Sequence, residues 1–211
     1  NLAGTGIGSF SDRLRDAVRG GGPFDGEASL RANQGWGNGI YVQKNDLSNN
    51  TRAQALHLAD LTRLGMAGNL KAFTFIDQTG NTIKGSELDY NGQAAGYAND
   101  AWEIQNYVSK HDNQTLWDIQ QYKIDYALPL ETRVRMQAVS LATAVLGQGV
   151  PFVHMGSELL RSKSMQRDSY DSGDWYNRVD FGKTSNNWNV GLPSQDKDGS
   201  NWSIIETVIA Q

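Results

Sequence analysis

The chain has 211 residues, of which 38% are hydrophobic and 20% charged, and its formal net charge at pH 7 is −4. This length allows one domain with a full hydrophobic core, and the acidic balance argues against a basic nucleic-acid-binding face. The absence of cysteine excludes disulfides and cysteine nucleophiles. No apolar run approaches the roughly 18 residues of a membrane-spanning helix, so we expect neither nucleic acid nor a membrane as partner.

The ends of the sequence indicate a piece of a longer protein. The chain opens with Asn1 in place of a methionine and shows no charged and apolar leader. It stops directly after a helical pattern at 204–210. We therefore expect further chain on both sides.

The first 50 residues predict loops around one short helix. Residues 4–20 lead from glycines to an N-cap at Ser9 or Ser11 and then to a helix. The glycines resemble a dinucleotide-binding turn, but the third glycine of that fingerprint is missing. A loop that leads into a helix is the better interpretation. Residues 20–50 predict a long irregular segment, which in a compact domain is usually functional or an insertion.

Helices and strands alternate through the rest of the chain. The predicted elements are helix 51–66, hairpin 73–83, strand 103–112, a helix from Thr115 to about Tyr122, helix 131–147 and strand 150–158. The helix at 131–147 is largely apolar, which is typical of a helix covered on more than one side. Short links between strands and helices predict parallel βα units, an α/β fold. In such folds, functional side chains gather at the carboxyl ends of the strands.

A polar triplet, His111-Asp112-Asn113, stands where the strand at 103–112 ends. Asp112 is a candidate acid, base or electrostatic stabiliser, with His111 as a hydrogen-bonding neighbour. It could equally help to cap the helix that begins near Thr115, and the pattern leaves both roles open. The sequence lacks the motif Gly-x-Ser-x-Gly of serine hydrolases and the His spacing of zinc proteases. Asp196–Gly199 does not have the spacing of an EF-hand.

Aromatic residues also occur in polar loops, away from the apolar helices. They are Trp36, Trp175, Tyr176, Trp188 and Trp202. Flat rings with polar neighbours suit a ligand that has both apolar faces and hydroxyl groups, such as a sugar. For any single ring, a role in anchoring its loop is the simpler interpretation.

Several stretches resemble the α-amylase superfamily of glycoside hydrolases, and in particular the type I pullulanases of bacteria. YVSKHDNQTLWD, residues 107–118, resembles the fourth signature region of that superfamily. Further similar stretches follow in the same order as in the pullulanases: GTGIGSFSDRLRDAVRGGGPF, HLADLTRLGMAGNL, DYNGQAAGYA, RVRMQAVSLATAVLGQG and GSELLRSKSMQRDSYDSGDWYNRVD. The resemblance covers nearly the whole chain.

The resemblance implies a (β/α)8 TIM-type barrel that hydrolyses α-1,6 branch linkages in pullulan and related glucans with retention of configuration. Asp112 matches the carboxylate that stabilises the transition state. His111 matches a histidine that hydrogen-bonds the same sugar, and Asn113 is a polar neighbour. Asp174 and Arg178 fit an acid and an arginine that bind an adjacent glucose. The resemblance implies no metal and no cofactor for the chemistry, and it leaves a structural calcium in the rest of the protein open.

The nucleophile and acid motifs of the family, Asp-Gly-Phe-Arg-like and Gly-Glu-Gly-Trp-like, do not occur in this sequence. We therefore expect residues 1–211 to be a loop-bearing part of one catalytic barrel, about strands six to eight, without the upstream strands and the C-terminal β domain. Such a chain depends on the N-terminal part of the barrel and should be inactive alone. The resemblance implies an extracellular or cell-surface location. Alternatives are a limit dextrinase, an isoamylase-type enzyme, or a glucan-binding fragment without catalysis.

Overall fold

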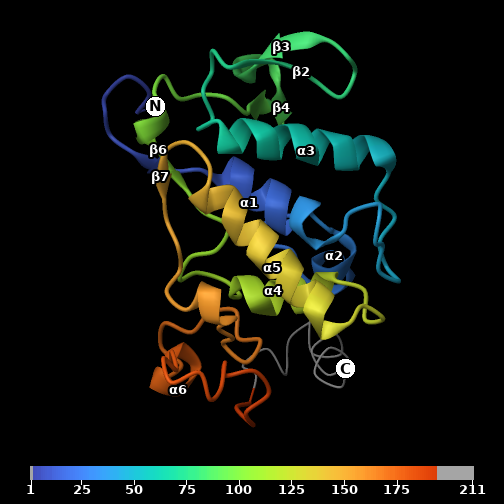
Figure 1. The fold of residues 1–211 in the computed structure, drawn as a ribbon, viewed down its shortest axis with the longest axis vertical. Helices are drawn as coiled ribbons and strands as arrows, with labels where there is room; N and C mark the ends of the chain where they lie inside the picture. The colour runs from blue at the N-terminus through green and yellow to red at the C-terminus, as the bar shows by residue number, and fades with distance from the viewer. Residues whose placement is uncertain (1, 194–211) are drawn as a thin grey trace.

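A computed structural model describes residues 2–193 of the chain as a mixed α/β structure (Figure 1). The helices are α1 (Asp12–Arg19), α2 (Glu27–Ala32), α3 (Arg52–Met66), α4 (Leu116–Lys123), α5 (Leu130–Val145) and α6 (Asp174–Asn177). The strands are β1 (Ser9–Phe10), β2 (Thr74–Ile76), β3 (Thr82–Lys84), β4 (Asp89–Tyr90), β5 (Gln93–Ala94), β6 (Ile104–Asn106) and β7 (Val150–Pro151). Short 3₁₀ helices are η1 (Trp36–Asn38), η2 (Gly85–Glu87), η3 (Ala101–Glu103) and η4 (Ser157–Leu159). The predicted helix at 204–210, Trp202 and Asp196–Gly199 lie outside the described residues.

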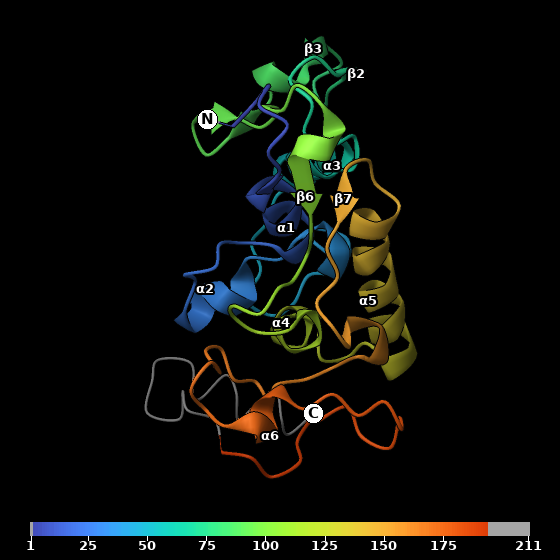
Figure 2. The same cartoon turned by 90° about the vertical axis from the view of Figure 1, so that its left-hand side faces the viewer.

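A parallel sheet with the order β1-β6-β7 organises the described chain. Ser9 pairs with Ile104, and Gln105 pairs with Val150. Helix α1 follows β1 directly, and α4 and α5 lie between β6 and β7 in sequence; in space α5 lies beside the sheet and α4 beyond the carboxyl end of β6 (Figure 2). The predicted parallel βα units are confirmed. No helix in the part of the chain that the structure describes is long and apolar enough to cross a membrane.

The strands are shorter than the sequence predicts. The expected strand 103–112 is regular only in β6, and the expected strand 150–158 only in β7. Beyond β6 the backbone bends until Asn113 adopts a left-handed φ of 61°. Beyond β7, Gly156 with φ 87° turns the chain into η4. The regular strands end where their pairing ends, because β1 and β7 each offer β6 only two paired residues, and the chain continues beyond them as loops.

The glycine loop at the N-terminus binds a carboxylate of the chain itself. Glu103 Oε1 accepts hydrogen bonds from the backbone N–H of Gly4 at 2.6 Å and of Gly6 at 3.3 Å. Ser9 belongs to β1, so the N-cap of α1 is Ser11, whose hydroxyl donates to Asn69 Oδ1 at 2.7 Å. The loop-then-helix interpretation holds, but β1 was not predicted.

Helix α1 packs closely on α3 in the centre of the molecule. Leu14 and Val18 are fully buried, and a Cβ added to Gly65 of α3 would lie 2.9 Å from the Cβ of Leu14. The predicted helix 51–66 is confirmed. It begins with a capping box in which Thr51 accepts from the N–H of Gln54 and the Gln54 side chain accepts from the N–H of Thr51.

Helix α5 is confirmed, but its surroundings differ from the prediction. Its buried face carries Arg133, Gln137, Ser140, Thr143 and Ala144. Val139, Val145 and Leu146 on and after the helix are 47%, 48% and 73% exposed. Within residues 2–193, α5 is therefore covered on one side only, and the side of α5 that is covered is largely polar. Apolar content alone did not reveal which side packs.

Two hairpins extend from the helical layer. The predicted hairpin at 73–83 is confirmed as β2 paired antiparallel with β3. Strands β4 and β5 were not predicted, although Asn91-Gly92 between them is a strong hairpin signal. Both residues have positive φ, 52° and 80°, as this two-residue turn requires. Helices α2 and η1 within the segment 20–50 were not predicted either.

Candidate active site

The polar triplet lies at the carboxyl end of the parallel sheet. Residues 110–113 follow β6 and precede α4, on the side where the segment that carries α6 is found (Figure 2). The loop contacts two other segments. Asn113 Nδ2 donates to the carbonyl of Pro23 at 3.5 Å, and Arg167 Nη2 donates to the same carbonyl at 2.8 Å. Three stretches that are distant in sequence therefore meet here.

Asp112 is an accessible and ionised carboxylate. Its side chain is 49% exposed, Lys110 Nζ donates to its Oδ2, and His111 Nε2 lies 3.0 Å from its Oδ1. The hydrogen bond from Lys110 lowers the pKa of Asp112 below its usual value, against a smaller opposing effect of burial. A fixed negative charge at a strand end can stabilise positive charge that develops on a bound ligand.

The side chains of His111 and Asn113 differ in their exposure and in their contacts. The His111 side chain is 80% exposed, so its imidazole can reach a ligand. Asn113 is held by its contact with Pro23 and by its left-handed backbone. The alternative role of Asp112 as a helix cap is wrong, because α4 is capped by Thr115, whose Oγ1 accepts from the N–H of Asp118 at 3.1 Å.

A buried lysine supports the loop from behind. Lys163 is 1% exposed, and its Nζ donates to the carbonyls of His111 at 3.3 Å and Arg167 at 3.0 Å. Burial lowers the pKa of Lys163 to about 8. The two carbonyls would be poorly satisfied without this ammonium. Lys163 therefore joins the triplet loop to the segment that follows β7.

Asp118 holds the same downstream segment to α4. It is fully buried, and it accepts hydrogen bonds from Ser162 Oγ and, at 2.7 Å, from the backbone N–H of Lys163. Burial raises its pKa to about 6, although the hydrogen bonds from Ser162 and Lys163 oppose the shift. Neither Asp118 nor Lys163 was predicted from the sequence as a supporting residue.

Asp174 and Arg178 lie at the two ends of α6 and are both exposed. Among residues 2–193, no hydrogen bond or ion pair joins either of them to His111, Asp112 or Asn113. Helix α6 is fixed instead through Asn177, whose Nδ2 donates to the Ser169 carbonyl at 2.7 Å. Their predicted role in sugar binding stays a prediction. Within the described residues, no group of three His, Asp or Glu side chains is placed to hold a metal ion.

His154 gives the downstream segment a pH-dependent contact. Arg161 Nη1 donates to His154 Nε2 at 3.1 Å, which requires a neutral imidazole. Burial, and then the charge of Arg161, lower the pKa of His154 to about 4. In the unfolded chain this pKa is near 6.5, so the unfolded state binds the extra proton first as pH falls.

We expect the contribution of His154 to stability to be complete above pH 6.5 and to be lost as pH falls towards 4. The loss should be about 1–2 kcal/mol, allowing for partial exposure. The measurement is thermal unfolding of wild type and His154→Gln at several pH values. The variant should show a smaller fall in Tm between pH 7 and pH 4.5. Equal falls in both proteins would contradict this role.

Comparison with known proteins identifies relatives over almost the whole chain. No protein-family model matches it. A pullulanase of Klebsiella aerogenes is 64% identical over 208 residues, which cover 99% of this chain and 19% of that protein. Pullulanase 1, chloroplastic, of Arabidopsis thaliana is 44% identical over 211 residues, 98% of this chain and 22% of that protein.

Solved structures give the same result. The crystal structure of Klebsiella pneumoniae pullulanase complexed with maltotriose matches at 64% identity with a TM-score of 0.95, over 99% of this chain and 20% of that chain. The apo pullulanase from the same organism also matches with a TM-score of 0.95, over 99% of this chain and 22% of the pullulanase chain. The chain spans about a fifth of the length of the relatives it matches. It is thus a mixed α/β segment homologous to one part of the pullulanases, which are glycosidases.

Proposed function

We propose that the protein containing this chain is a debranching enzyme that hydrolyses α-1,6 linkages in pullulan and amylopectin-type glucans. The observation that carries the proposal is the 64% identity to a pullulanase over 99% of the chain. It is supported by an accessible, ionised Asp112 at the carboxyl end of a parallel sheet, a position typical of catalytic groups in α/β folds.

In this proposal the reaction proceeds with retention through an oxocarbenium-like transition state. Asp112 stabilises the positive charge that develops at the anomeric carbon. The exposed imidazole of His111 hydrogen-bonds hydroxyl groups of the same glucose, and Asn113 contributes a polar edge to that site. Asp174 and Arg178 bind the neighbouring glucose through their exposed charged groups.

Retaining cleavage needs two more carboxyl groups, about 5 Å apart across the scissile bond. We assign the nucleophile and the acid to earlier strands of a (β/α)8 barrel, of which this chain supplies about strands six to eight. The 211-residue chain alone should therefore not cleave pullulan. The chemistry requires no cofactor in this proposal, a structural calcium elsewhere in the protein stays open, and the enzyme acts outside the cell or at its surface.

The proposed partner is an α-glucan chain or oligosaccharide. Three of the similar solved structures are Klebsiella pneumoniae proteins in complex with maltotriose, which supports an oligosaccharide ligand for this chain as well. The alternatives are a limit dextrinase or isoamylase-type enzyme, which would differ in the preferred chain length of the substrate. A glucan-binding protein without turnover is the alternative from another class.

The test is cleavage of pullulan by the full-length protein, followed by the reducing ends released and by the size of the products. Release of maltotriose units supports the pullulanase assignment. Faster turnover of short branched dextrins than of pullulan would favour the limit dextrinase alternative. Binding of pullulan without any increase in reducing ends would overturn the enzymatic proposal.

Lys163 provides a second test, because it acts on the reaction only through the loop it supports. Lys163→Met removes the ammonium that holds the carbonyls of His111 and Arg167. We expect kcat for pullulan to fall by roughly 10–100-fold, as expected when a site is displaced by a fraction of an ångström. Lys163→Arg, which keeps the charge and donors, should recover part of that loss. A variant with wild-type kcat would show that the loop does not depend on Lys163.

A further inference from the structure

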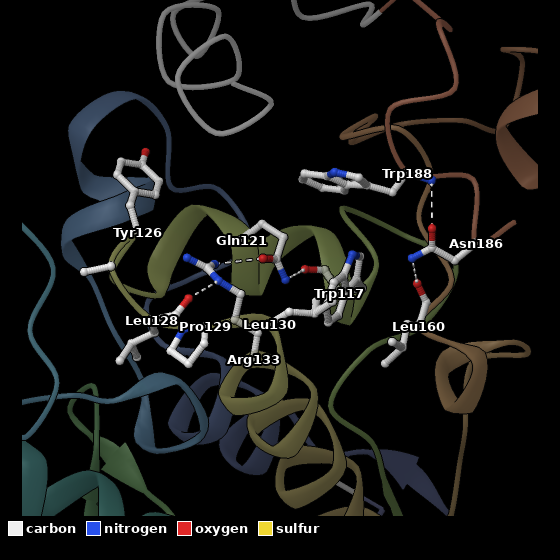
Figure 3. A pocket seen from close by; sticks show the side chains of 11 residues that line it. Trp117, Gln121, Tyr126, Leu128, Pro129, Leu130, Arg133, Leu160, Asn186 and Trp188 are labelled. Atoms are coloured by element: carbon white, nitrogen blue, oxygen red, sulfur yellow. Dashed lines mark hydrogen bonds between the residues drawn. The ribbon is translucent and has the colours of Figure 1, made fainter. Parts of the chain in front are cut away.

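A pocket lies between α4, the beginning of α5 and the segment that follows β7 (Figure 3). Its volume is about 680 Å³, within the range of roughly 300–1,000 Å³ that is typical of small-molecule sites. The lining comes from Trp117 and Gln121 of α4, from Tyr126–Pro129, from Leu130 and Arg133 of α5, and from Leu160, Asn186 and Trp188. None of residues 110–113 contributes to it, so this pocket is separate from the candidate active site.

The described lining of the pocket offers a ligand no free charge. Among the lining residues that the structure describes, Arg133 is the only charged one, and its guanidinium already donates to the carbonyls of Leu128 and Asp125 and to Gln121 Oε1. The Asn186 side chain already has hydrogen-bond partners as well. Its Oδ1 accepts from the backbone N–H of Trp188, and its Nδ2 donates to the Leu160 carbonyl at 2.9 Å. A carboxylate or phosphate would therefore find no unpaired cation here, and the ligand that fits is uncharged.

One buried donor in the lining has no partner. Trp117 is 5% exposed, and within the described residues its Nε1 makes no hydrogen bond. Figure 3 shows this indole nitrogen on the side of the ring that faces Trp188 across the pocket. Buried N–H groups are almost always paired in native proteins, because an unpaired one costs about 1–3 kcal/mol. An unpaired donor that points into a pocket indicates a ligand with an acceptor oxygen.

Aromatic surfaces supply the other half of the recognition. The ring of Trp188 lies across the pocket from Trp117 in Figure 3. Tyr126 closes one end, and its ring is packed by the guanidinium of Arg31 at 3.7 Å, which holds it in place. Flat, fixed rings suit a ligand with a flat apolar face. Such a face, together with hydroxyl acceptors and no charge, is the chemistry of a glucose unit.

We propose that this pocket is a second α-glucan-binding site, which holds glucose units of a polymer away from the residues around Asp112. This inference rests on the proposed function for the choice of glucan among uncharged sugars. Trp188 and Trp117 contact the faces of the sugar, and the Trp117 N–H donates to a sugar oxygen. The site increases the affinity of the enzyme for a long chain, and it does not contribute to the cleavage of a short one.

Trp117→Phe is the sharpest test, since it removes the N–H and keeps most of the ring. In the full-length protein we expect binding of amylopectin, measured by affinity electrophoresis, to weaken by roughly 5-fold, the effect of one lost hydrogen bond. The Tm of the unliganded variant should be equal to or higher than that of wild type, because an unpaired buried donor has been removed. A purely structural tryptophan would instead lose stability and leave glucan binding unchanged.

Trp188→Ala and Trp102→Ala form a matched pair. Trp188→Ala should weaken amylopectin binding by roughly 10-fold, raise KM for amylopectin and leave kcat for a short branched oligosaccharide unchanged. Trp102 is 62% exposed in η3 and does not line the pocket, so its variant should bind as wild type does.

The outcomes separate this inference from the proposed function. Failure of wild type to cleave pullulan would overturn the function, and the binding assay would still report on the pocket. Wild-type amylopectin affinity in both Trp117→Phe and Trp188→Ala would overturn the second site. The same conclusion would follow if a crystal structure of the full-length protein showed another part of the protein filling the pocket.

Discussion

Asp112→Asn in the full-length protein is expected to reduce pullulan cleavage by roughly 10³-fold, the effect of removing one preorganised electrostatic group from an active site. Asparagine keeps the size of the side chain but loses the negative charge that the proposal places beside the anomeric carbon. Because the Asp112 side chain is half exposed, the substitution should change folding stability by less than about 0.5 kcal/mol. The measurement is kcat for pullulan together with the Tm.

Asp89→Asn is the matched control. Asp89 is an exposed carboxylate on the β4–β5 hairpin, at the other end of the described structure from α6 (Figure 1). Its variant should keep wild-type kcat. An Asp112→Asn enzyme that still cleaves pullulan at more than a tenth of the wild-type rate would remove Asp112 from the mechanism. Equal losses in both variants would show that the effect is not local.

Asp118→Ala should cause a large loss of folding stability, in contrast to Asp112→Asn. The substitution leaves two buried donors without an acceptor, Ser162 Oγ and the backbone N–H of Lys163. We expect the free energy of unfolding to fall by about 3–5 kcal/mol, which is typical when one partner of a buried charged network is removed. Thermal or urea unfolding measures this loss, and protease cleavage within 161–169 should become faster.

Asp118→Asn separates shape from charge. The oxygen of the amide can still accept from Ser162, but its NH₂ group faces the backbone N–H of Lys163, and two donors cannot form a hydrogen bond. We therefore expect a loss of stability smaller than that of Asp118→Ala. The raised pKa of Asp118, about 6, means that the folded state favours the protonated acid. Its contribution to stability is therefore complete below about pH 4 and falls as pH rises through 6. The stability of wild type relative to Asp118→Asn should fall over the same interval, and a constant difference would contradict the pKa assignment.

The sequence predicted those elements that local signals determine. The helix 51–66 was visible from its spacing and its Thr51 cap, and the hairpin at 73–83 from alternation around a turn. It did not predict the length of β6 or β7, because a strand extends only as far as its pairing with neighbouring strands, which is a tertiary contact. Strand β1 was missed for a similar reason. Two residues become a strand only because β6 lies beside them.

Of the residues of the candidate site, only those marked by a local sequence signal could be predicted. The strand-end position of Asp112 could be predicted, since strand ends gather functional groups and the motif is contiguous in sequence. Lys163 and Asp118 could not be, because their importance comes from burial and from partners more than 40 residues away. A buried lysine has the same one-letter signature as an exposed one. Only the fold distinguishes them.

The bond from Lys163 to the carbonyl of His111 joins positions 52 residues apart. The loop with Asp112 therefore cannot be transferred to another protein without the segment that carries Lys163. A chimera that exchanges residues 109–114 between related enzymes would import a backbone fitted to one lysine and place it against another side chain. Protein engineers who wish to alter specificity at this loop should exchange 109–114 and 161–167 together, as one unit with two separate stretches of sequence.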